Sequence, residues 1–382
     1  MMPALAQTDI AAPSSPLPRH VLHVFPSFGI GGVPLRMARV INHVGKRLRH
    51  TVIALDNNFE AAEGLAGDVA LMAPRNRSVG SLRAIARGSM TLHRVRPDLL
   101  MTYNWGSIEW AMANRLLPVS RHLHIEAGFS QAEADTQLPR RVRFRRWALA
   151  RCDRVVVPSR LLEGLACDVW GLPRERVMYV PNGVDVARFC SLARDIAPGF
   201  TRRRGELVVG TVAPLRPEKN VGRLLQVFAR LDPSLAVSLL VAGDGVEREP
   251  LERLAAELGI AERVVFTGRV APEDVLGSVD IFALSSDTEQ MPNALLEAMS
   301  ASLPVAAVDV GDVKSIVCED NREFIVPRDD GPAFTSAITQ LLRNLDKRRA
   351  LGAKNRERVV SEYSQERMFA TYSTLLTAED AH

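Results

Sequence analysis

Two carboxylates eight positions apart flank an expected helix start in the stretch Glu289-Gln290-Met291-Pro292-Asn293-Ala294-Leu295-Leu296-Glu297. The preceding run, Asp280-Ile281-Phe282-Ala283-Leu284, predicts a buried strand, and Pro292 suits the first helical position, where its missing N–H costs nothing. Glu289 should therefore lie in the strand-to-helix loop and Glu297 about one turn inside the helix. Between them, the free backbone N–H groups of the first turn can bind phosphate. Because carboxylates accept hydrogen bonds from paired hydroxyls, the pattern indicates a sugar nucleotide. Two glutamates at this spacing also arise by chance.

The composition fits a globular protein of two domains. The chain has 382 residues, of which 47% are hydrophobic and 24% charged. Only 5% are aromatic, which argues against a nucleic-acid partner bound by base stacking. The net charge of +4 permits an anionic partner without requiring one.

The cysteines and the first residues bear on the compartment. The four cysteines include no C-x-x-C pair, so we expect neither a zinc site nor a disulfide framework, and a reducing, cytoplasmic location. Residues 1–19 are rich in Ala, Pro and Ser and predict a disordered tail rather than a signal peptide. No run of 18 apolar residues is present, so no membrane span is expected.

Strands and helices alternate in two series along the chain. Strands are expected at 21–25, 51–55, 99–102, 122–125, 154–157 and 177–180, and again at 207–212, 238–241, 264–266, 281–284, 305–307 and 323–325. Helical periodicity is found at 33–44, 108–117, 140–150 and 159–170. The pattern predicts two doubly wound α/β domains at 20–190 and 205–360, with ligands bound between them. Residues 361–382 should form a C-terminal helix that packs back toward the first domain.

Two loops at expected strand ends are candidates for binding an anion. Phe28-Gly29-Ile30-Gly31-Gly32-Val33-Pro34 opens a helix, and glycines there let the backbone approach a phosphate. Arg216-Pro217-Glu218-Lys219-Asn220 places two cations at the first strand of the second domain. A plain tight turn and a solvated basic turn remain the alternatives.

Weaker candidates lie at other strand ends. Ala242-Gly243-Asp244-Gly245 and Thr267-Gly268-Arg269-Val270 are glycine turns, and His124 should end a first-domain strand that faces the cleft. The arginine-rich segment from Arg140 to Arg154, interleaved with apolar residues, can lie on an anionic bilayer surface or form a solvated helix face.

Together these motifs resemble the family-4 retaining glycosyltransferases of the GT-B fold, from about Val21 to Leu376. The resemblance rests on the Gly31-Gly32 loop, Val180-Pro181-Asn182-Gly183-Val184-Asp185, Pro217-Glu218-Lys219-Asn220, Val241-Ala242-Gly243-Asp244-Gly245 and the E-x7-E element from Glu289 to Glu297.

The resemblance implies roles for individual residues. Glu297 would hold the ribose and Glu289 the donor sugar, while Lys219 binds the diphosphate. Asn293, Ala294, Gly31 and Gly32 would assist through their backbone, with Gly243 in the neighbouring turn. Arg269 and Val270 would line the base pocket, and His124 would approach the transferred sugar. The implied substrates are a nucleoside-diphosphate sugar and a glycan or lipid-linked acceptor, used without a cofactor or metal.

One position departs from the family pattern. Pro214 stands where the family usually has an arginine, and we hypothesise that Arg216 supplies the guanidinium instead. The alternatives are an epimerase or hydrolase with the same cleft, and a non-catalytic sugar-nucleotide binding protein. A two-Rossmann dehydrogenase is disfavoured because the chain has no full G-x-G-x-x-G fingerprint.

Overall fold

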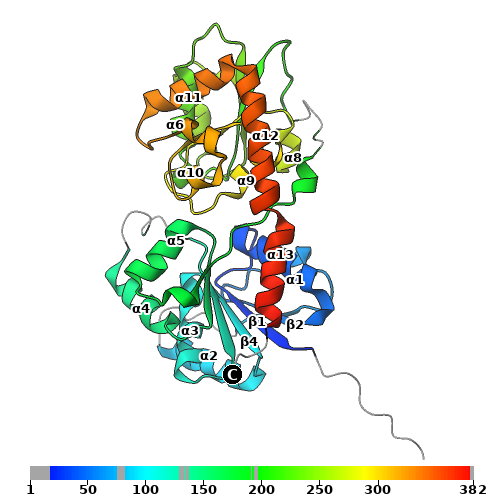
Figure 1. Ribbon diagram of the computed structural model, residues 1–382, viewed down its shortest axis with the longest axis vertical. Helices are drawn as coiled ribbons and strands as arrows, with labels where there is room; N and C mark the ends of the chain where they lie inside the picture. The colour runs from blue at the N-terminus through cyan, green and yellow to red at the C-terminus, as the bar shows by residue number, and fades with distance from the viewer. Residues whose placement is uncertain are drawn as a thin grey trace, which may run out of the picture.

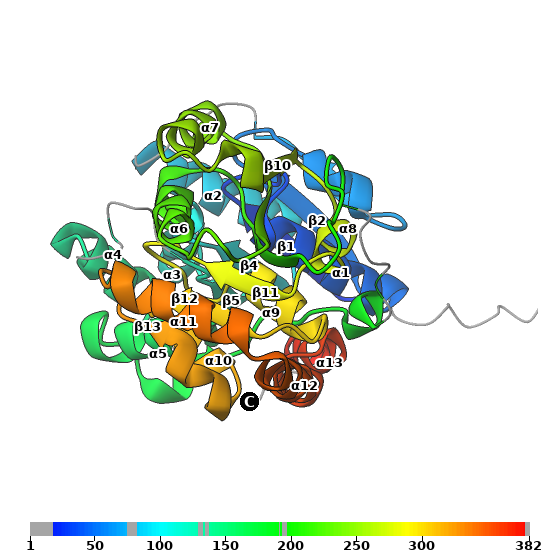
Figure 2. The ribbon, with the colours of Figure 1, turned by 90° about the horizontal axis from the view of Figure 1, so that it is seen from above.

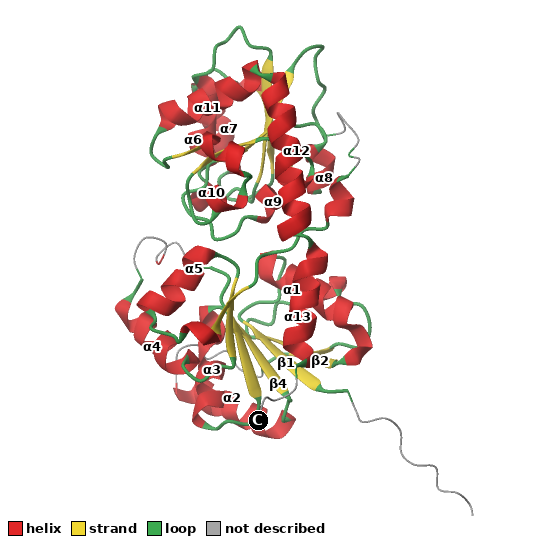
Figure 3. Cartoon of the chain, in the orientation of Figure 1, coloured by secondary structure: helices red, strands yellow, loops and turns green. Residues whose placement is uncertain are grey.

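The chain folds into two α/β domains stacked along the long axis of the molecule (Figure 1). The computed structural model describes residues 18–74, 82–128, 133, 137–190, 192 and 197–378. Figure 3 shows a sheet in each domain with helices packed around it. The predicted class, two doubly wound Rossmann-like domains, is confirmed. Most of the predicted tail, 1–19, and residues 379–382 lie outside the described residues.

The first domain is built on a parallel sheet with the strand order β3-β2-β1-β4-β5-β6-β7. Its central strands are almost continuously buried because both faces of the sheet are covered, although several of their buried residues are histidines. The strands are β1 His20–Phe25, β2 Arg49–Ala54, β3 Ala70–Met72, β4 Leu99–Tyr103, β5 Arg121–Ile125, β6 Arg154–Val157 and β7 Val177–Tyr179. The helices are α1 Gly32–Val44, α2 Leu82–Val95, α3 Ile108–Leu116, α4 Pro139–Leu149 and α5 Arg160–Gly164.

The second domain repeats this plan with the order β10-β9-β8-β11-β12-β13. The strands are β8 Leu207–Val212, β9 Val237–Ala242, β10 Val264–Gly268, β11 Ile281–Leu284, β12 Val305–Val308 and β13 Ile325–Val326. The helices are α6 Val221–Ala229, α7 Arg248–Glu257, α8 Pro272–Leu276, α9 Asn293–Ser300, α10 Val313–Ile316, α11 Gly331–Arg343 and α12 Leu345–Glu362. The strand order reverses between β1 and β4 and between β8 and β11. Such switch points are where ligands bind in these sheets.

Two segments cross between the domains and lie side by side. Val184 N donates to Tyr363 O and Gln365 N donates to Val184 O, each at 2.9 Å. The chain then enters α13, Gln365–Thr377, which returns to the first domain and packs on α1. Its buried residues Met368, Tyr372 and Leu376 join the first domain's core. In Figures 1 and 2, α12 and α13 lie on one side of the molecule. They follow each other directly in the chain, α12 in the second domain and α13 in the first.

The predicted elements differ from the observed ones mainly at four places. The expected strand 323–325 is largely a 3-10 turn, Glu319–Phe324, followed by the two-residue β13, because Asn321 bonds the backbone of Val305 there. The expected helix 159–170 is the short α5 followed by a π turn, Leu165–Val169. The short edge strand β3 was not predicted. Pro292 is the N-cap of α9 rather than its first residue.

Candidate active site

A cleft of about 380 Å³ lies between the domains at the two switch points. The first domain contributes the start of α1 and Ala127 after β5, and the linker contributes Asn182. The second domain contributes the segments that follow β8 and β11, and the start of α9. Of the predicted site residues, the cleft is lined by Gly32, Arg216, Lys219, Glu289, Asn293 and Ala294.

The loops after β8 and β11 are tied to each other. Asp287 N donates to Glu218 O at 2.8 Å. Asn220, in the left-handed conformation that asparagine tolerates, caps α6 and donates its amide to Asp287. Arg223 bonds both Ser285 O and Asp287 Oδ1 at 2.7 Å. The turn from Arg216 to Asn220 and the Glu289 loop are therefore held together at one edge of the sheet.

Lys219 and Glu289 form an ion pair in the wall of the cleft. Lys219 Nζ lies 2.5 Å from Glu289 Oε1, and Ser286 Oγ donates to the same oxygen at 2.8 Å. The two side chains are 19% and 11% exposed, so both remain accessible from the cleft. A diphosphate could take over the cation, and sugar hydroxyls could take over the carboxylate.

The amino ends of α1 and α9 face each other across the cleft. Gly31 is the N-cap of α1 and Pro292 that of α9, and no side chain that the structure describes caps either helix. A Cβ atom built on Gly32 would lie 3.6 Å from Asn293 Nδ2. Asn182 donates its amide to Met291 O at 3.0 Å and to Asn293 Oδ1 at 2.9 Å. Free N–H groups from both domains thus converge on one place, which suits an anion.

Glu297 lies one turn into α9, as predicted. Burial raises the pKa of its carboxyl to about 7, an effect that the charges of Arg188 and Arg39 only partly offset. Glu273, ion-paired to Arg188, raises it further. A carboxyl that titrates near neutral pH beside two cations is suited to accept hydrogen bonds from ligand hydroxyls.

The remaining donor-side residues lie in the turns after β9 and β10. A Cβ atom at Gly243 would lie 1.8 Å from Ala213 O, so glycine is required where the turn after β9 meets the segment after β8. Arg269 is exposed, and Val270 packs partly buried against the second domain's core. Their contact with a base stays a prediction.

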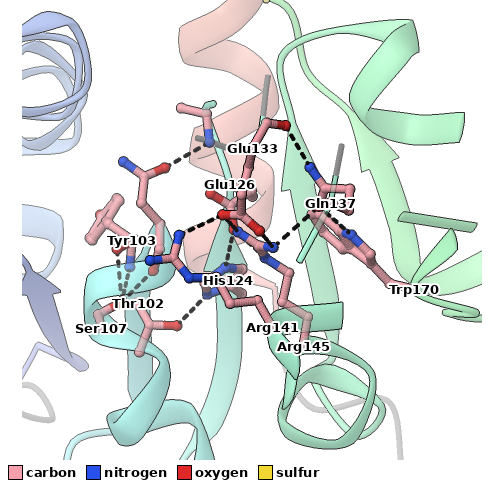
Figure 4. Close-up of polar contacts among 12 residues, drawn as sticks. Thr102, Tyr103, Ser107, His124, Glu126, Glu133, Gln137, Arg141, Arg145 and Trp170 are labelled. Carbon is pink, nitrogen blue, oxygen red and sulfur yellow. Dashed lines mark hydrogen bonds and ion pairs between the residues drawn. The ribbon is translucent and has the colours of Figure 1, made fainter. Parts of the chain in front are cut away.

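His124 lies inside the first domain, which corrects the expectation that it faces the cleft. Its side chain has no exposed surface. Nδ1 lies 2.8 Å from Thr102 Oγ1 and Nε2 lies 3.7 Å from Glu126 Oε2 (Figure 4). The reason is its position in β5, one residue before the strand's end and under covering helices. In the segment that follows β5, the described residue that lines the cleft is Ala127.

Glu126 belongs to a buried charge cluster that also contains Glu133, Arg141 and Arg145 (Figure 4). Arg145 is fully buried, with Nε 3.4 Å from Glu126 Oε2 and Nη1 3.0 Å from Glu133 Oε1. Arg141 Nη1 lies 2.7 Å from Glu133 Oε2. Burial raises the pKa of Glu133, but hydrogen bonds from Arg145 and Arg141 outweigh it and lower the pKa overall. The cluster ties α4 to the segment that follows β5.

Several arginines of the predicted basic helix therefore contact other parts of the first domain rather than solvent alone. Arg141 and Arg145 serve the cluster, and Arg146 donates to Trp170 O at 2.8 Å. The exposed arginines of the segment are Arg140, Arg143, Arg146, Arg151 and Arg154. Among the residues that the structure describes, no helix is long and apolar enough to cross a membrane.

The sequence interpretation missed four residues of the cleft and its supports: Arg36, Asn182 as a contact of α9, Ser286 and Arg223. Arg36 follows Gly32 by four positions, so helical spacing alone places both on one face of α1. Asn182 was noted only as part of a turn. Its contacts across the domain boundary cannot be deduced from local sequence.

Comparison with known proteins places the chain in a family. Residues 194–358 match the model for glycosyl transferases group 1, and residues 30–188 match that for glycosyltransferase family 4. The two matches together take in both domains. The chain belongs to this glycosyltransferase family, which confirms the resemblance.

The individual relatives share less than 30% of their residues with the chain. The chain is 29% identical over 75% of its length to a D-inositol 3-phosphate glycosyltransferase of Salinispora tropica, and 27% identical over 67% to one of Nocardia farcinica. These matches span 66% and 61% of the two relatives. The crystal structure of Anabaena HepE in complex with UDP and glucose superimposes with a TM-score of 0.78. It covers 94% of this chain and 100% of HepE at 18% identity, and so shows the shared fold.

Removal of Arg145 should destabilise the protein. Arg145→Met leaves the carboxylates of Glu126 and Glu133 buried without this cation, a change that costs about 3–5 kcal/mol. Arg143→Met, on the exposed face of the same helix, should stay within about 0.5 kcal/mol of the parent. Urea and thermal unfolding of the two variants measure this difference. Equal midpoints would show that the cluster contributes nothing to stability.

Proposed function

We propose that the protein is a retaining glycosyltransferase that moves a sugar, of the hexose type, from a nucleoside-diphosphate sugar to a glycan or lipid-linked acceptor. The observation that carries the proposal is the ion pair of Lys219 and Glu289 beside the uncapped start of α9, in a cleft between two Rossmann-like domains. A cation, free N–H groups and carboxylates lie in one place, as the parts of a sugar nucleotide require.

The proposed roles follow from the geometry and the family. Lys219 and Arg216 bind the diphosphate together with the start of α9 at Asn293 and Ala294. The backbone of Gly31 and Gly32 contacts the diphosphate from the first domain. These groups stabilise the negative charge that develops on the leaving diphosphate, which is electrostatic preorganisation without need of a divalent metal. Arg216 is exposed and lies 3.5 Å from Glu218, so it can turn toward the cleft in place of the arginine that Pro214 replaces.

The sugar and nucleoside would be held by carboxylates and the neighbouring turns. Glu289 accepts hydrogen bonds from the donor sugar, and Glu297 accepts those of the ribose. Arg269 and Val270 line the pocket of the base. His124 is assigned no contact with the sugar because its side chain is fully buried within the first domain and does not line the cleft.

In the proposed reaction the bond from the anomeric carbon to the diphosphate oxygen breaks, which leaves oxocarbenium character on the sugar. An acceptor hydroxyl attacks the face that the diphosphate leaves, and its proton passes to the departing phosphate oxygen. The anomeric configuration is therefore retained. No covalent sugar–enzyme intermediate is proposed.

The exposed surface of α4 is the observation from which we infer the kind of acceptor. Its exposed arginines give the first domain a basic patch that would contact an anionic membrane at its cytoplasmic face. A lipid-linked acceptor, in the assembly of a surface polysaccharide or glycolipid, would fit this location.

Thermal unfolding with UDP, GDP, ADP, dTDP and NAD, with and without EDTA, tests the proposal. A ligand at about 100 times its dissociation constant adds roughly 2.7 kcal/mol and raises the melting temperature by several degrees. We expect one nucleoside diphosphate to stabilise the protein regardless of EDTA, and Lys219→Met to remove most of the shift. A shift with NAD alone, or with none of the panel, would contradict the proposal.

The titration of Glu297 predicts how binding depends on pH. With a pKa of about 7, its carboxyl is mostly protonated at lower pH, and only the ionised form accepts from two ribose hydroxyls. Because the ligand favours ionisation, binding releases a proton, and affinity for the nucleoside diphosphate should rise up to about tenfold from pH 6 to pH 8.

The control variant is Glu297→Gln, which does not titrate and should show weaker, pH-independent binding. Calorimetric titrations in buffers of different ionisation heat measure both the affinity and the released proton. An identical pH profile for the parent and the variant would assign the titration to another group.

A further inference from the structure

Arg36 is a buried cation in the cleft without a carboxylate partner. It lies in α1 with 8% of its surface exposed and lines the cleft. Its Nη1 donates to the neutral amide oxygen of Asn182, and its buried Nε has no hydrogen-bond partner in the described part of the structure. Nor does any carboxylate described in the structure form an ion pair with it. The other cations that line the cleft, Lys219 and Arg216, pair with Glu289 and Glu218.

Two neutral side chains also lie near Arg36. The phenols of Tyr103 and Tyr372 lie within its electrostatic range, and burial raises the pKa of both, so they carry no charge near neutral pH. A buried charge without a counter-charge is costly, so a ligand that supplies the opposite charge would be favoured here.

The backbone around Arg36 points to the charge of that ligand. Gly32 and Arg36 are four residues apart on α1 and share one face. Pro34 has no N–H, so the free donors of the uncapped first turn are Gly32 and Val33, both of which line the cleft. On the opposite wall, Asn182 holds Met291 and Asn293 at the start of α9. A guanidinium and two helix N-termini form a site for phosphate, and both acids among the described residues that line the cleft, Glu218 and Glu289, are ion-paired.

We propose that Arg36 binds a phosphate group of the substrate from the first-domain wall, with Asn182 positioning its guanidinium between α1 and α9. The inference rests on the proposed function and adds to it a first-domain anion ligand. The phosphate belongs either to the diphosphate of the donor or to a phosphorylated acceptor. The two sources share their chemistry and differ in which reagent Arg36 responds to.

Arg36→Met tests this inference in two binding experiments. In the first, isothermal titration compares the nucleoside diphosphate that stabilises the parent with its nucleoside. Loss of one charge-assisted hydrogen bond should weaken the affinity for the nucleoside diphosphate about 10- to 100-fold and leave the affinity for the nucleoside unchanged. In the second, inorganic phosphate is added to protein saturated with the nucleoside diphosphate. Extra thermal stabilisation in the parent that is absent in Arg36→Met would assign the phosphate to the acceptor.

Control variants separate this role from a structural one. Arg47→Met removes an exposed arginine just beyond α1 and should change neither experiment. Arg36→Lys keeps the charge and should recover part of the affinity. The ligand-free melting temperature of Arg36→Met should stay equal to that of the parent or rise, because an unbalanced buried charge is removed.

The outcomes distinguish the two proposals. Unchanged affinity in both experiments overturns the role of Arg36, whether or not the variant melts lower. Parent protein that binds no nucleoside diphosphate contradicts the proposed function. Inorganic phosphate alone then still tests Arg36: equal stabilisation of the parent and Arg36→Met would overturn its role.

Discussion

The amino ends of α1 and α9 are brought together by the geometry of parallel sheets. In a strand–helix unit, the carboxyl end of the strand and the amino end of the helix lie at the same edge of the sheet. When two such sheets face each other edge to edge, their unsatisfied N–H groups converge. The structure realises this at Gly32 and Asn293, and the cleft takes its chemistry from there. Lys219 and Glu289 then add side chains to a site whose polarity the backbone has already set.

Charge balance distinguishes the two buried arginines that the structure describes in the first domain. Arg145 lies among carboxylates and ties α4 to the segment after β5, so its contribution is to stability. Arg36 is also buried, although it lines the cleft, and its partner among the described residues is a neutral amide. The same side chain thus serves the fold in one place and, as we infer, the ligand in the other. The difference lies in the neighbours rather than in the burial.

The fold was predictable because the strands of both domains are short, apolar and separated by helical periods. Residues 154–157, 207–212 and 281–284 form strands with the predicted bounds. Local signals also placed Glu289 in a loop and Glu297 in a helix. β3 and β13 were missed or misplaced because edge strands of two or three residues have little pattern of their own.

The site was less predictable wherever it depends on packing between distant segments. His124 carries the right residue type at a strand end, yet one residue decides whether a side chain reaches the cleft or remains under the helices. The arginine run gave no sign that Arg145 would be buried, because its carboxylate partners lie in another segment. Arg36 stood apart from the recognised motifs, and only the absence of a described counter-charge around it reveals its role.

A crystal structure of the protein with its nucleoside diphosphate would test the central claim most directly. The account predicts that the diphosphate lies between α1 and α9, with phosphate oxygens about 2.7–3.2 Å from the backbone N atoms of Gly32 and Asn293 or Ala294. Lys219 would have turned from Glu289 toward the phosphate. A nucleotide bound outside this cleft, or phosphates that leave the ion pair of Lys219 and Glu289 and both helix ends untouched, would contradict it.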